Sequence, residues 1–223
     1  MQPQRFKDRR EAGHVLSTHL IHYAGRPDVL VLALPRGGVP VASEVARALH
    51  APLDVFVVRK LGLPWQPELA MGAIAPDGVE VLNGDVVTAY NVPPAVIREV
   101  AARESLELAR RMTFYRGDRP AQTIAGRTVI LVDDGLATGS TMKAAITALR
   151  RRQPRKIVAA VPVAARESCI EVGTVADEMV CAYTPPDFAA VGSWYENFSQ
   201  TSDDEVRGLL LDQRMHSTSA ANE

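Results

Sequence analysis

Five short segments of the chain are almost continuously apolar, and most are followed by glycine, proline or charged residues. Between them lie segments such as "VASEVARALH" and "STMKAAITALRR", in which apolar residues recur at helical spacing. Strands that are apolar on both faces are typical of a parallel sheet covered by helices on both sides. The sequence therefore predicts an α/β fold with a doubly wound, mostly parallel sheet of about five strands, at residues 28–34, 53–60, 128–134, 156–163 and 178–183.

The other elements follow from local signals. Residues 11–25 have helical spacing, and a long helix is expected over 93–115, because proline is tolerated in the first helical turn. A Pro/Gly-rich loop and then a hairpin turning at Pro76–Gly78 should precede that helix. Ser202 and Glu205 have capping-box spacing, which predicts a final helix.

No repeat or long linker divides the 223 residues, so we expect a single domain, 1–223. Its core should cover about 26–183, and the N-terminal helix together with 184–211 should form a small hood. The final helix is expected to end at Leu211, and the polar tail, 212–223, to be disordered.

Composition excludes several classes of protein. The formal net charge is −1, which gives the chain no overall field for nucleic acid or membranes. No apolar stretch approaches the roughly 18 residues of a membrane span, and the N-terminus lacks a signal-peptide core. Cys169 and Cys181 have no metal-binding spacing and are expected to remain free of a disulfide. These features predict a cytoplasmic protein.

The segment "VILVDDGLATGST", 129–141, carries the most specific chemistry. Asp133 and Asp134 follow a predicted strand, and ligands of open α/β sheets bind at the carboxyl ends of strands. Gly135 and Gly139 allow the backbone to approach a ligand, and the helix that follows offers free N–H groups to a phosphate. Paired carboxylates suit vicinal hydroxyls or a hydrated magnesium ion. The pattern therefore indicates a site for a sugar phosphate.

Other interpretations of this segment fit less well. A Walker A loop needs a lysine directly after its second glycine, whereas Lys143 lies a full turn later. No G-x-G-x-x-G dinucleotide fingerprint follows any predicted strand. The plain structural alternative is a strand-ending turn followed by a Ser-Thr helix cap.

The same segment resembles the phosphoribosyl-pyrophosphate (PRPP) signature of type I phosphoribosyltransferases. The rest of the chain is similar to bacterial phosphoribosyltransferase-domain proteins of undefined acceptor, through "FKDRREAG", "LALPRGGVPVA" and "AVGSWYENFSQTSDDEV". The resemblance implies that Asp133 and Asp134 bind the ribose hydroxyls and act in catalysis, and touch the metal only through water. It implies a 5-phosphate site at Gly135, Ala137, Thr138, Gly139, Ser140 and Thr141.

The segment "LPRGGVP" fits the family's pyrophosphate loop. Gly37 and Gly38 expose backbone N–H groups, and Arg36 adds a planar cation suited to phosphate oxygens. The resemblance places Pro35 in the same loop and gives Arg36 a catalytic role. The alternative is an ordinary strand-to-helix turn.

Arg59 and Lys60 end the second predicted strand, where two cations could hold pyrophosphate and Lys60 could assist catalysis. The alternative is a solvated strand end. Residues 61–70 lie where the family has a flexible catalytic loop that closes over the site and excludes water. Trp65 in this segment is either a contact of that lid or a packing residue.

Recognition of the base is assigned by resemblance to the hood. Phe188, Trp194 and Tyr195 lie in this aromatic-rich region and could stack on a heterocycle or anchor the segment to the core. The 6-oxopurine enzymes have a lysine after the strand that follows the PRPP helix, whereas this chain has only Arg166 nearby. That departure weakens a hypoxanthine or guanine assignment, and the acceptor base stays undefined.

The expected activity is transfer of ribose 5-phosphate from PRPP to a nitrogenous base with release of pyrophosphate. Mg²⁺, bound largely through PRPP, is the expected cofactor. Nucleic acid and membranes are not expected partners, and a homodimer is left open. The alternative is a non-catalytic regulator of the same fold that senses PRPP or a nucleotide and binds RNA or DNA. Its binding surface would be the basic cluster Arg150, Arg151, Arg152, Arg155 and Lys156.

Overall fold

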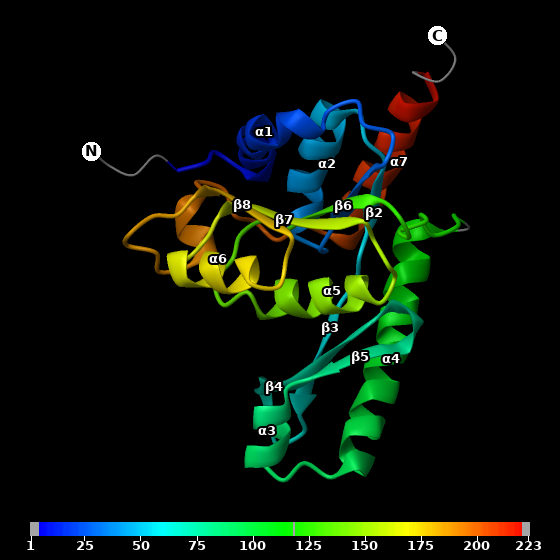
Figure 1. Ribbon diagram of the computed structural model, residues 1–223, viewed down its shortest axis with the longest axis vertical. Coiled ribbons are helices and arrows are strands. Elements are labelled where there is room, and N and C mark those ends of the chain that lie inside the picture. The colour runs from blue at the N-terminus through cyan, green and yellow to red at the C-terminus, as the bar shows by residue number, and fades with distance from the viewer. Residues whose placement is uncertain (1–4, 118, 220–223) are drawn as a thin grey trace.

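The computed structural model describes residues 5–117 and 119–219, and its strands form two sheets (Figure 1). The larger sheet has the order β2-β1-β6-β7-β8, and every neighbouring pair is parallel. Its strands are β2 (Leu53–Val55), β1 (Val29–Ala33), β6 (Thr128–Val132), β7 (Lys156–Val163) and β8 (Glu178–Tyr183). The predicted five-stranded parallel sheet is therefore confirmed.

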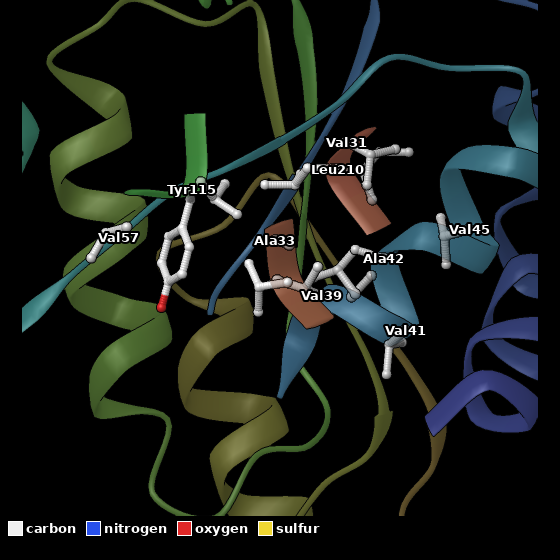
Figure 2. Packing of buried hydrophobic residues seen from close by; sticks show 14 of the residues in the cluster. Val31, Ala33, Val39, Val41, Ala42, Val45, Val57, Tyr115 and Leu210 are labelled. Atoms are coloured by element: carbon white, nitrogen blue, oxygen red, sulfur yellow. The ribbon is translucent and has the colours of Figure 1, made fainter. Parts of the chain in front are cut away.

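Helices cover both faces of this sheet. In Figure 1, one face carries α1 (Arg9–Leu20), α2 (Gly38–Leu49) and α7 (Asp203–Ser219), and the other carries α5 (Ser140–Arg150) and α6 (Arg166–Gly173). Alternate strand residues face the two sides: Val31 and Ala33 pack with α2 and α7 (Figure 2), whereas Leu30 and Leu32 pack with α5. This double burial explains why the strands have no polar face.

The second sheet is antiparallel and has the order β3-β4-β5. Its strands are β3 (Arg59–Leu63), β4 (Gln66–Ala75) and β5 (Val79–Leu82), and the predicted turn at Pro76–Gly78 is confirmed as a 3-10 turn. The short helix α3 (Gly84–Ala89) and the long helix α4 (Pro94–Arg116) complete this part of the molecule (Figure 1).

This sheet corrects two predictions. The segment 53–60 is two strands in different sheets, because the chain leaves the large sheet after Val55 and begins β3 at Arg59. Phe56 and Val57 lie between the two strands and are buried in different core clusters. The sequence is therefore apolar here although the residues belong to no strand. Residues 61–70, predicted to be a flexible loop, lie mostly in paired β-strands.

The C-terminal end of the chain differs in part from expectation. At the N-terminal end, the Phe6 N–H donates to the Trp194 carbonyl at 2.9 Å, and Ala12 of α1 packs with Trp194 and Tyr195. A hood made of these two segments stays a prediction. The cap of α7 is as predicted, since the Glu205 N–H donates to Ser202 Oγ at 3.1 Å. The helix continues to Ser219, so predicted disorder is wrong for 212–219, and 220–223 lie outside the described residues.

Cys169 of α6 and Cys181 of β8 form a disulfide, which contradicts the expectation that they stay unpaired. Disulfides persist in oxidising compartments, so the cysteines no longer support the prediction of a cytoplasmic setting. Within the described residues, no helix combines the length and apolar character that crossing a membrane requires.

Candidate active site

Two loops meet at the carboxyl edge of the large sheet. Gly37 ends the loop after β1 and Gly38 is the first residue of α2, while the loop after β6 contains Asp133 and Asp134. The two are packed closely: a Cβ atom on Gly37 would lie 2.0 Å from Oδ2 of Asp134, and one on Gly38 would lie 2.7 Å from the Val132 carbonyl oxygen. Only glycine fits these contacts. The structure thus brings the predicted pyrophosphate loop against the predicted ribose carboxylates.

The carboxylate pair has an unusual electrostatic setting. Burial raises the pKa of Asp133 well above its ordinary value, and the adjacent charge of Asp134 raises it further. Burial also raises the pKa of Asp134, although its bond to Arg9 partly offsets this effect. Oδ1 of Asp133 accepts a hydrogen bond from the Asp134 N–H at 2.9 Å. Perturbed carboxyl groups that converge at a sheet edge are typical of a functional site.

Two contacts to Asp134 were missed by the sequence analysis. Arg9, at the start of α1, donates from Nε to Oδ2 of Asp134 at 2.8 Å. The Tyr195 hydroxyl donates to the Asp134 carbonyl oxygen at 2.5 Å. Nothing in the local sequence signals the first contact, since 125 residues separate its partners. The aromatic content around Tyr195 did mark that segment, although for a different role.

The predicted 5-phosphate loop connects β6 to α5. Leu136 anchors it, because its N–H donates to the Val163 carbonyl at 2.9 Å and its side chain is buried. Gly139 has φ +68° and directly precedes α5. Ala137, Thr138, Ser140 and Thr141 are exposed.

The loop is supported from one side and open on the other. The Ser168 hydroxyl of α6 donates to the Ala137 carbonyl, and Val172 of α6 packs against Gly139. In the described part of the chain, the N–H groups of Ala137, Thr138 and Gly139 donate to no protein acceptor. An exposed bend with free N–H groups ahead of a helix N-terminus is suited to an anion.

Arg36 lies in the loop after β1, where the Pro35–Arg36 peptide bond is cis. Its Nη1 is 4.0 Å from Oδ1 of Asp203, at the start of α7. The Tyr115 hydroxyl donates to the same oxygen at 2.5 Å, and burial together with this bond raises the pKa of Tyr115 to about 12. The long ion pair leaves the half-buried Arg36 guanidinium capacity for further hydrogen bonds.

Arg59 and Lys60 do not end a strand of the large sheet, which corrects the prediction. They begin β3 of the second sheet. Arg59 Nη2 lies 2.6 Å from Glu104 of α4, and Lys60 Nζ lies 3.2 Å from Glu68 of β4. These residues line a cavity of about 420 Å³ together with Leu63 and Arg103. Their role toward pyrophosphate stays a prediction.

The hood aromatics divide into two groups. Trp194 and Tyr195 are only 6% and 4% exposed, and Trp194 packs edge-on against Tyr183 with ring centroids 5.3 Å apart. Rings buried to this degree anchor the segment and have no free face for a base, so their predicted stacking role is wrong in this conformation. Phe188 is half-buried against the same cluster, and its role stays a prediction.

The fold and this edge define an α/β protein with a doubly wound parallel sheet, whose two glycine-containing loops and carboxylate pair meet at the carboxyl ends of the strands. The chain belongs to the family described as the phosphoribosyl transferase domain, whose model matches residues 9–192. This confirms the resemblance found in the sequence.

Individual relatives agree with this assignment. The chain is 50% identical over 205 residues to a protein of Mycobacterium tuberculosis (strain H37Rv) named "Putative phosphoribosyl transferase Rv0571c", covering 92% of this chain and 46% of that protein. The chain thus spans less than half the length of this relative. It is 25% identical over 141 residues to "Bifunctional protein PyrR" of Corynebacterium diphtheriae, covering 63% of this chain and 56% of that protein.

A solved structure is also similar. The protein TT1426 from Thermus thermophilus is 42% identical in sequence and superposes with a TM-score of 0.82. The match covers 94% of this chain and 99% of that one. The arrangement of the two sheets is therefore shared with a known fold.

Proposed function

We propose that the protein is a phosphoribosyltransferase that transfers ribose 5-phosphate from PRPP to a nitrogenous base, as in nucleotide salvage. One observation carries the proposal: a half-buried carboxylate pair lies between an amide-lined bend and a glycine loop, all at the carboxyl edge of one sheet. Membership of the phosphoribosyl transferase domain family supports it.

Each part of PRPP has a candidate partner. Asp133 and Asp134 accept hydrogen bonds from the ribose hydroxyls. The bend at Gly135–Thr141 binds the 5-phosphate through its N–H groups and hydroxyls. Gly37, Gly38 and Arg36 face the pyrophosphate, and Arg59 and Lys60 at the start of β3 are further candidate cations for it.

The reaction breaks the bond between C1 of the ribose and the pyrophosphate oxygen and forms a bond from C1 to nitrogen. Positive charge develops on the sugar ring, and negative charge develops on the leaving pyrophosphate. The carboxylates stabilise the first, and Arg36 with the glycine amides stabilises the second. The proton on the attacking nitrogen leaves to solvent or to Asp134. The protein thus contributes orientation and electrostatics.

Magnesium fits this site as part of the substrate complex. Among the described residues, no group of three or more His, Cys, Asp or Glu side chains could hold a metal ion. Mg²⁺ prefers oxygen ligands and keeps several waters, so PRPP oxygens would bind it, with Asp133 and Asp134 reaching it through water. When bound, the ion neutralises charge on the leaving group.

The test combines binding with turnover. The protein is incubated with PRPP, Mg²⁺ and a panel of nitrogenous bases, and pyrophosphate release is measured for each base. We expect release with at least one base, and a loss of about tenfold or more for Asp134→Asn, as for a lost hydrogen bond to a charged group. If no base causes release although PRPP binds tightly, the transferase proposal is wrong. If Asp134→Asn keeps full kcat and PRPP affinity, Asp134 is not the group that accepts the proton from the attacking nitrogen.

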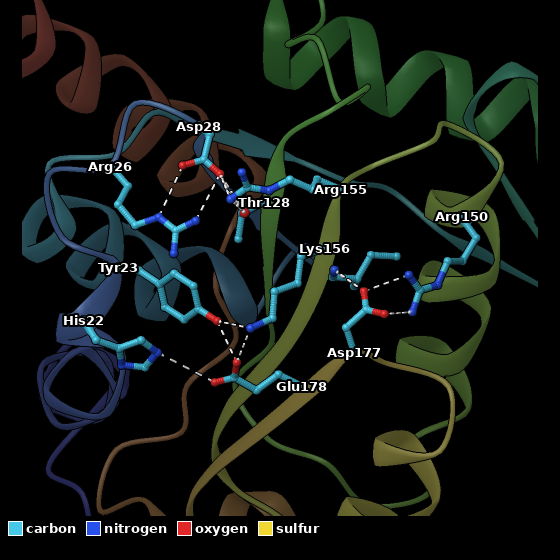
Figure 3. A network of polar contacts seen from close by, with 11 residues as sticks. His22, Tyr23, Arg26, Asp28, Thr128, Arg150, Arg155, Lys156, Asp177 and Glu178 are labelled. Carbon is cyan, nitrogen blue, oxygen red and sulfur yellow. Dashed lines mark hydrogen bonds and ion pairs between the residues drawn. The ribbon is translucent and has the colours of Figure 1, made fainter.

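The alternative, a regulator that binds RNA or DNA, is supported by less. The relative with "Bifunctional" in its name covers only part of the chain. The basic cluster at 150–156 is largely neutralised: Arg150 forms two hydrogen bonds to Asp177, Arg155 contacts Asp28, and Lys156 contacts Glu178 (Figure 3). Arg152 pairs with Asp77. Salt-dependent retention of RNA or DNA would nevertheless favour this alternative.

A further inference from the structure

We propose that Arg9 is a positioning residue that aims the Asp134 carboxylate at the pentose and thereby sets how strongly the site prefers ribose over deoxyribose phosphates. The inference rests on the proposed function, because it assigns Asp134 to the sugar hydroxyls. It concerns a residue outside the motif that marks the site.

The contact between Arg9 and Asp134 leaves one carboxylate oxygen for a ligand. Arg9 Nε donates to Oδ2 at 2.8 Å, and the two side chains are only 11% and 15% exposed. Among the described residues, no side chain donates to Oδ1 of Asp134. Arg9 therefore fixes the plane of the carboxylate and leaves Oδ1 with lone pairs for a hydroxyl.

The Arg9 guanidinium is itself held in place. Its Nη1 donates to the Ser199 carbonyl at 2.7 Å, and its Cζ lies 4.0 Å from the centroid of the Phe198 ring. A cation against an aromatic face and a backbone carbonyl is oriented from two directions. The segment around Phe198 thus transmits its position through Arg9 to Asp134.

Asp134 is restrained on two further sides. The Tyr195 hydroxyl holds its carbonyl oxygen, and Gly37 packs against its carboxylate. With the backbone fixed, rotation of the carboxylate is the freedom that remains, and Arg9 removes it. Substrate-positioning side chains depend on such supporting contacts, because small misplacements reduce binding and rate strongly.

A purely stabilising salt bridge is the competing explanation. A largely buried ion pair is weak evidence for stability, because desolvation offsets its attraction. The two explanations differ in what they predict for ligands. Loss of a stabilising pair lowers stability and weakens all ligands alike, whereas loss of a positioning pair weakens the ligands whose hydroxyl contacts Asp134.

The experiment measures binding of ribose 5-phosphate, 2-deoxyribose 5-phosphate, 3-deoxyribose 5-phosphate and inorganic phosphate by calorimetry. The quantity compared is the Kd ratio between ribose 5-phosphate and the deoxy sugar that binds the wild type more weakly. We expect a ratio of about tenfold or more in the wild type, as for a hydrogen bond to a charged group. Arg9→Met should reduce it toward one while phosphate binding is kept.

Two further variants sharpen the result. Arg9→Lys keeps the charge but not the planar fork, so an intermediate ratio is expected, and this variant serves if Arg9→Met does not fold. Arg10→Met is the matched control, since Arg10 is the exposed neighbour on the same helix, and its ratio should equal that of the wild type.

The outcomes separate the two proposals. An unchanged ratio in both Arg9 variants overturns the positioning role, and so does an equal weakening of all four ligands. A wild type that binds none of the sugar phosphates overturns the proposed function, and the inference with it.

Discussion

Both ends of the large sheet carry acidic residues, but the two groups of acids differ in how fully they are paired with cations. At the amino end, Asp28, Asp177 and Glu178 each contact at least one cation (Figure 3). At the carboxyl end, Arg9 is the one cation among the described residues that acts on Asp133 and Asp134. The same fold therefore provides a neutralised edge and an undercompensated one.

The pKa directions reflect this difference. Hydrogen bonds from Arg26 and Thr128 lower the pKa of Asp28 to about 2. Burial alone would raise the pKa of Glu178, but bonds from Lys156 and Tyr23 lower it. At the other edge, burial raises the pKa of both Asp133 and Asp134.

The two edges differ in whether their acidic residues stabilise the folded chain. The paired acids connect the starts of neighbouring strands. Asp28 precedes β1 and accepts a hydrogen bond from Thr128 of β6. Asp177 and Glu178 lie at the start of β8 and accept hydrogen bonds from β7. Such pairs serve the fold. An acid pair left short of cations is retained at a cost in stability, which is typical of positions that serve a ligand.

The largest effect is expected for Gly37→Ala. A Cβ atom there would lie 2.0 Å from Oδ2 of Asp134, so the carboxylate must leave Arg9 or the loop must shift. Overpacking of this kind costs about 3 kcal/mol of unfolding free energy. Binding of ribose 5-phosphate should fall by about a hundredfold, consistent with the loss of a hydrogen bond to a charged group. Denaturant unfolding and calorimetry measure the two effects.

Gly208→Ala is the matched control. Gly208 lies in α7 with no atom within 4 Å of an added Cβ. Alanine there should stabilise the protein by about 0.5–1 kcal/mol without changing ligand binding. If Gly37→Ala and Gly208→Ala change unfolding free energy and ligand binding equally, the close contact between Gly37 and Asp134 does not contribute to either.

The disulfide should give the second effect. Cys169 and Cys181 lie 12 residues apart, and in the chain-entropy treatment a loop of this size stabilises by about 2–3 kcal/mol. The Cys169→Ala/Cys181→Ala variant should lose that stability. Because α6 supports the bend through Ser168 and Val172, phosphate binding should weaken as well.

Reducing agent provides the control for this prediction. It should lower the melting temperature of the wild type to that of the double variant and leave the double variant unchanged. A wild type that is insensitive to reduction, with both thiols accessible to alkylation, would show that the cysteines are not paired.

The sequence predicted the parts of this contrast that depend on local patterns. Continuous apolar runs predicted the parallel sheet, and strand ends located Asp133, Asp134 and the loop at Gly37. However, a continuous apolar segment indicates burial and does not indicate which strand it is hydrogen-bonded to. For that reason the segment 53–60 was predicted to be one strand, although its middle residues only connect two sheets.

The parts that failed depend on distant partners. Arg9 meets Asp134 across 125 residues, and Cys169 meets Cys181 only because α6 returns beside β8. The polar tail read as disordered, yet Gln213 of α7 donates to the Ser43 carbonyl of α2 at 2.8 Å. Local sequence patterns predict none of these contacts, because each one joins residues that only the folded structure brings together.

The third prediction is that Asp133→Asn stabilises the protein while weakening the ligand. Since the folded-state pKa of Asp133 is raised, its ionisation destabilises the fold as pH rises above about 4, the ordinary range of aspartate. Removing this undercompensated charge should therefore increase unfolding free energy by about 1–2 kcal/mol at pH 7. Ribose 5-phosphate binding should fall by about tenfold.

The pH dependence distinguishes this explanation from improved packing. The gain in stability should shrink as pH falls and vanish near pH 3, about one unit below the ordinary aspartate pKa, where the wild-type residue is largely protonated in both states. A gain that persists unchanged at low pH would mean that charge is not its cause. Thermal unfolding between pH 3 and pH 8 provides the measurement.

The smallest effect is expected for Asp28→Asn, the same chemical change at the opposite edge of the sheet. Asp28 accepts hydrogen bonds from Thr128 at 2.8 Å and Arg155 at 2.6 Å, and its pKa is lowered from 3.8 to about 2. Its stabilisation is present above pH 4 and is lost as pH falls through about 2. At pH 7 the variant should lose about 1 kcal/mol or less, because the side chain is 27% exposed and solvent screens the pair.

Ligand binding by the Asp28→Asn variant should match the wild type, because the change lies at the edge away from the site. If Asp28→Asn lowers the unfolding free energy at pH 7 and Asp133→Asn raises it, the acids at the amino edge stabilise the fold and the acid pair at the carboxyl edge does not. If both substitutions destabilise the protein equally, the acid pair at the end of β6 is compensated as fully as the amino-edge network. The case for a ligand-directed charge at Asp133 and Asp134 would then be lost.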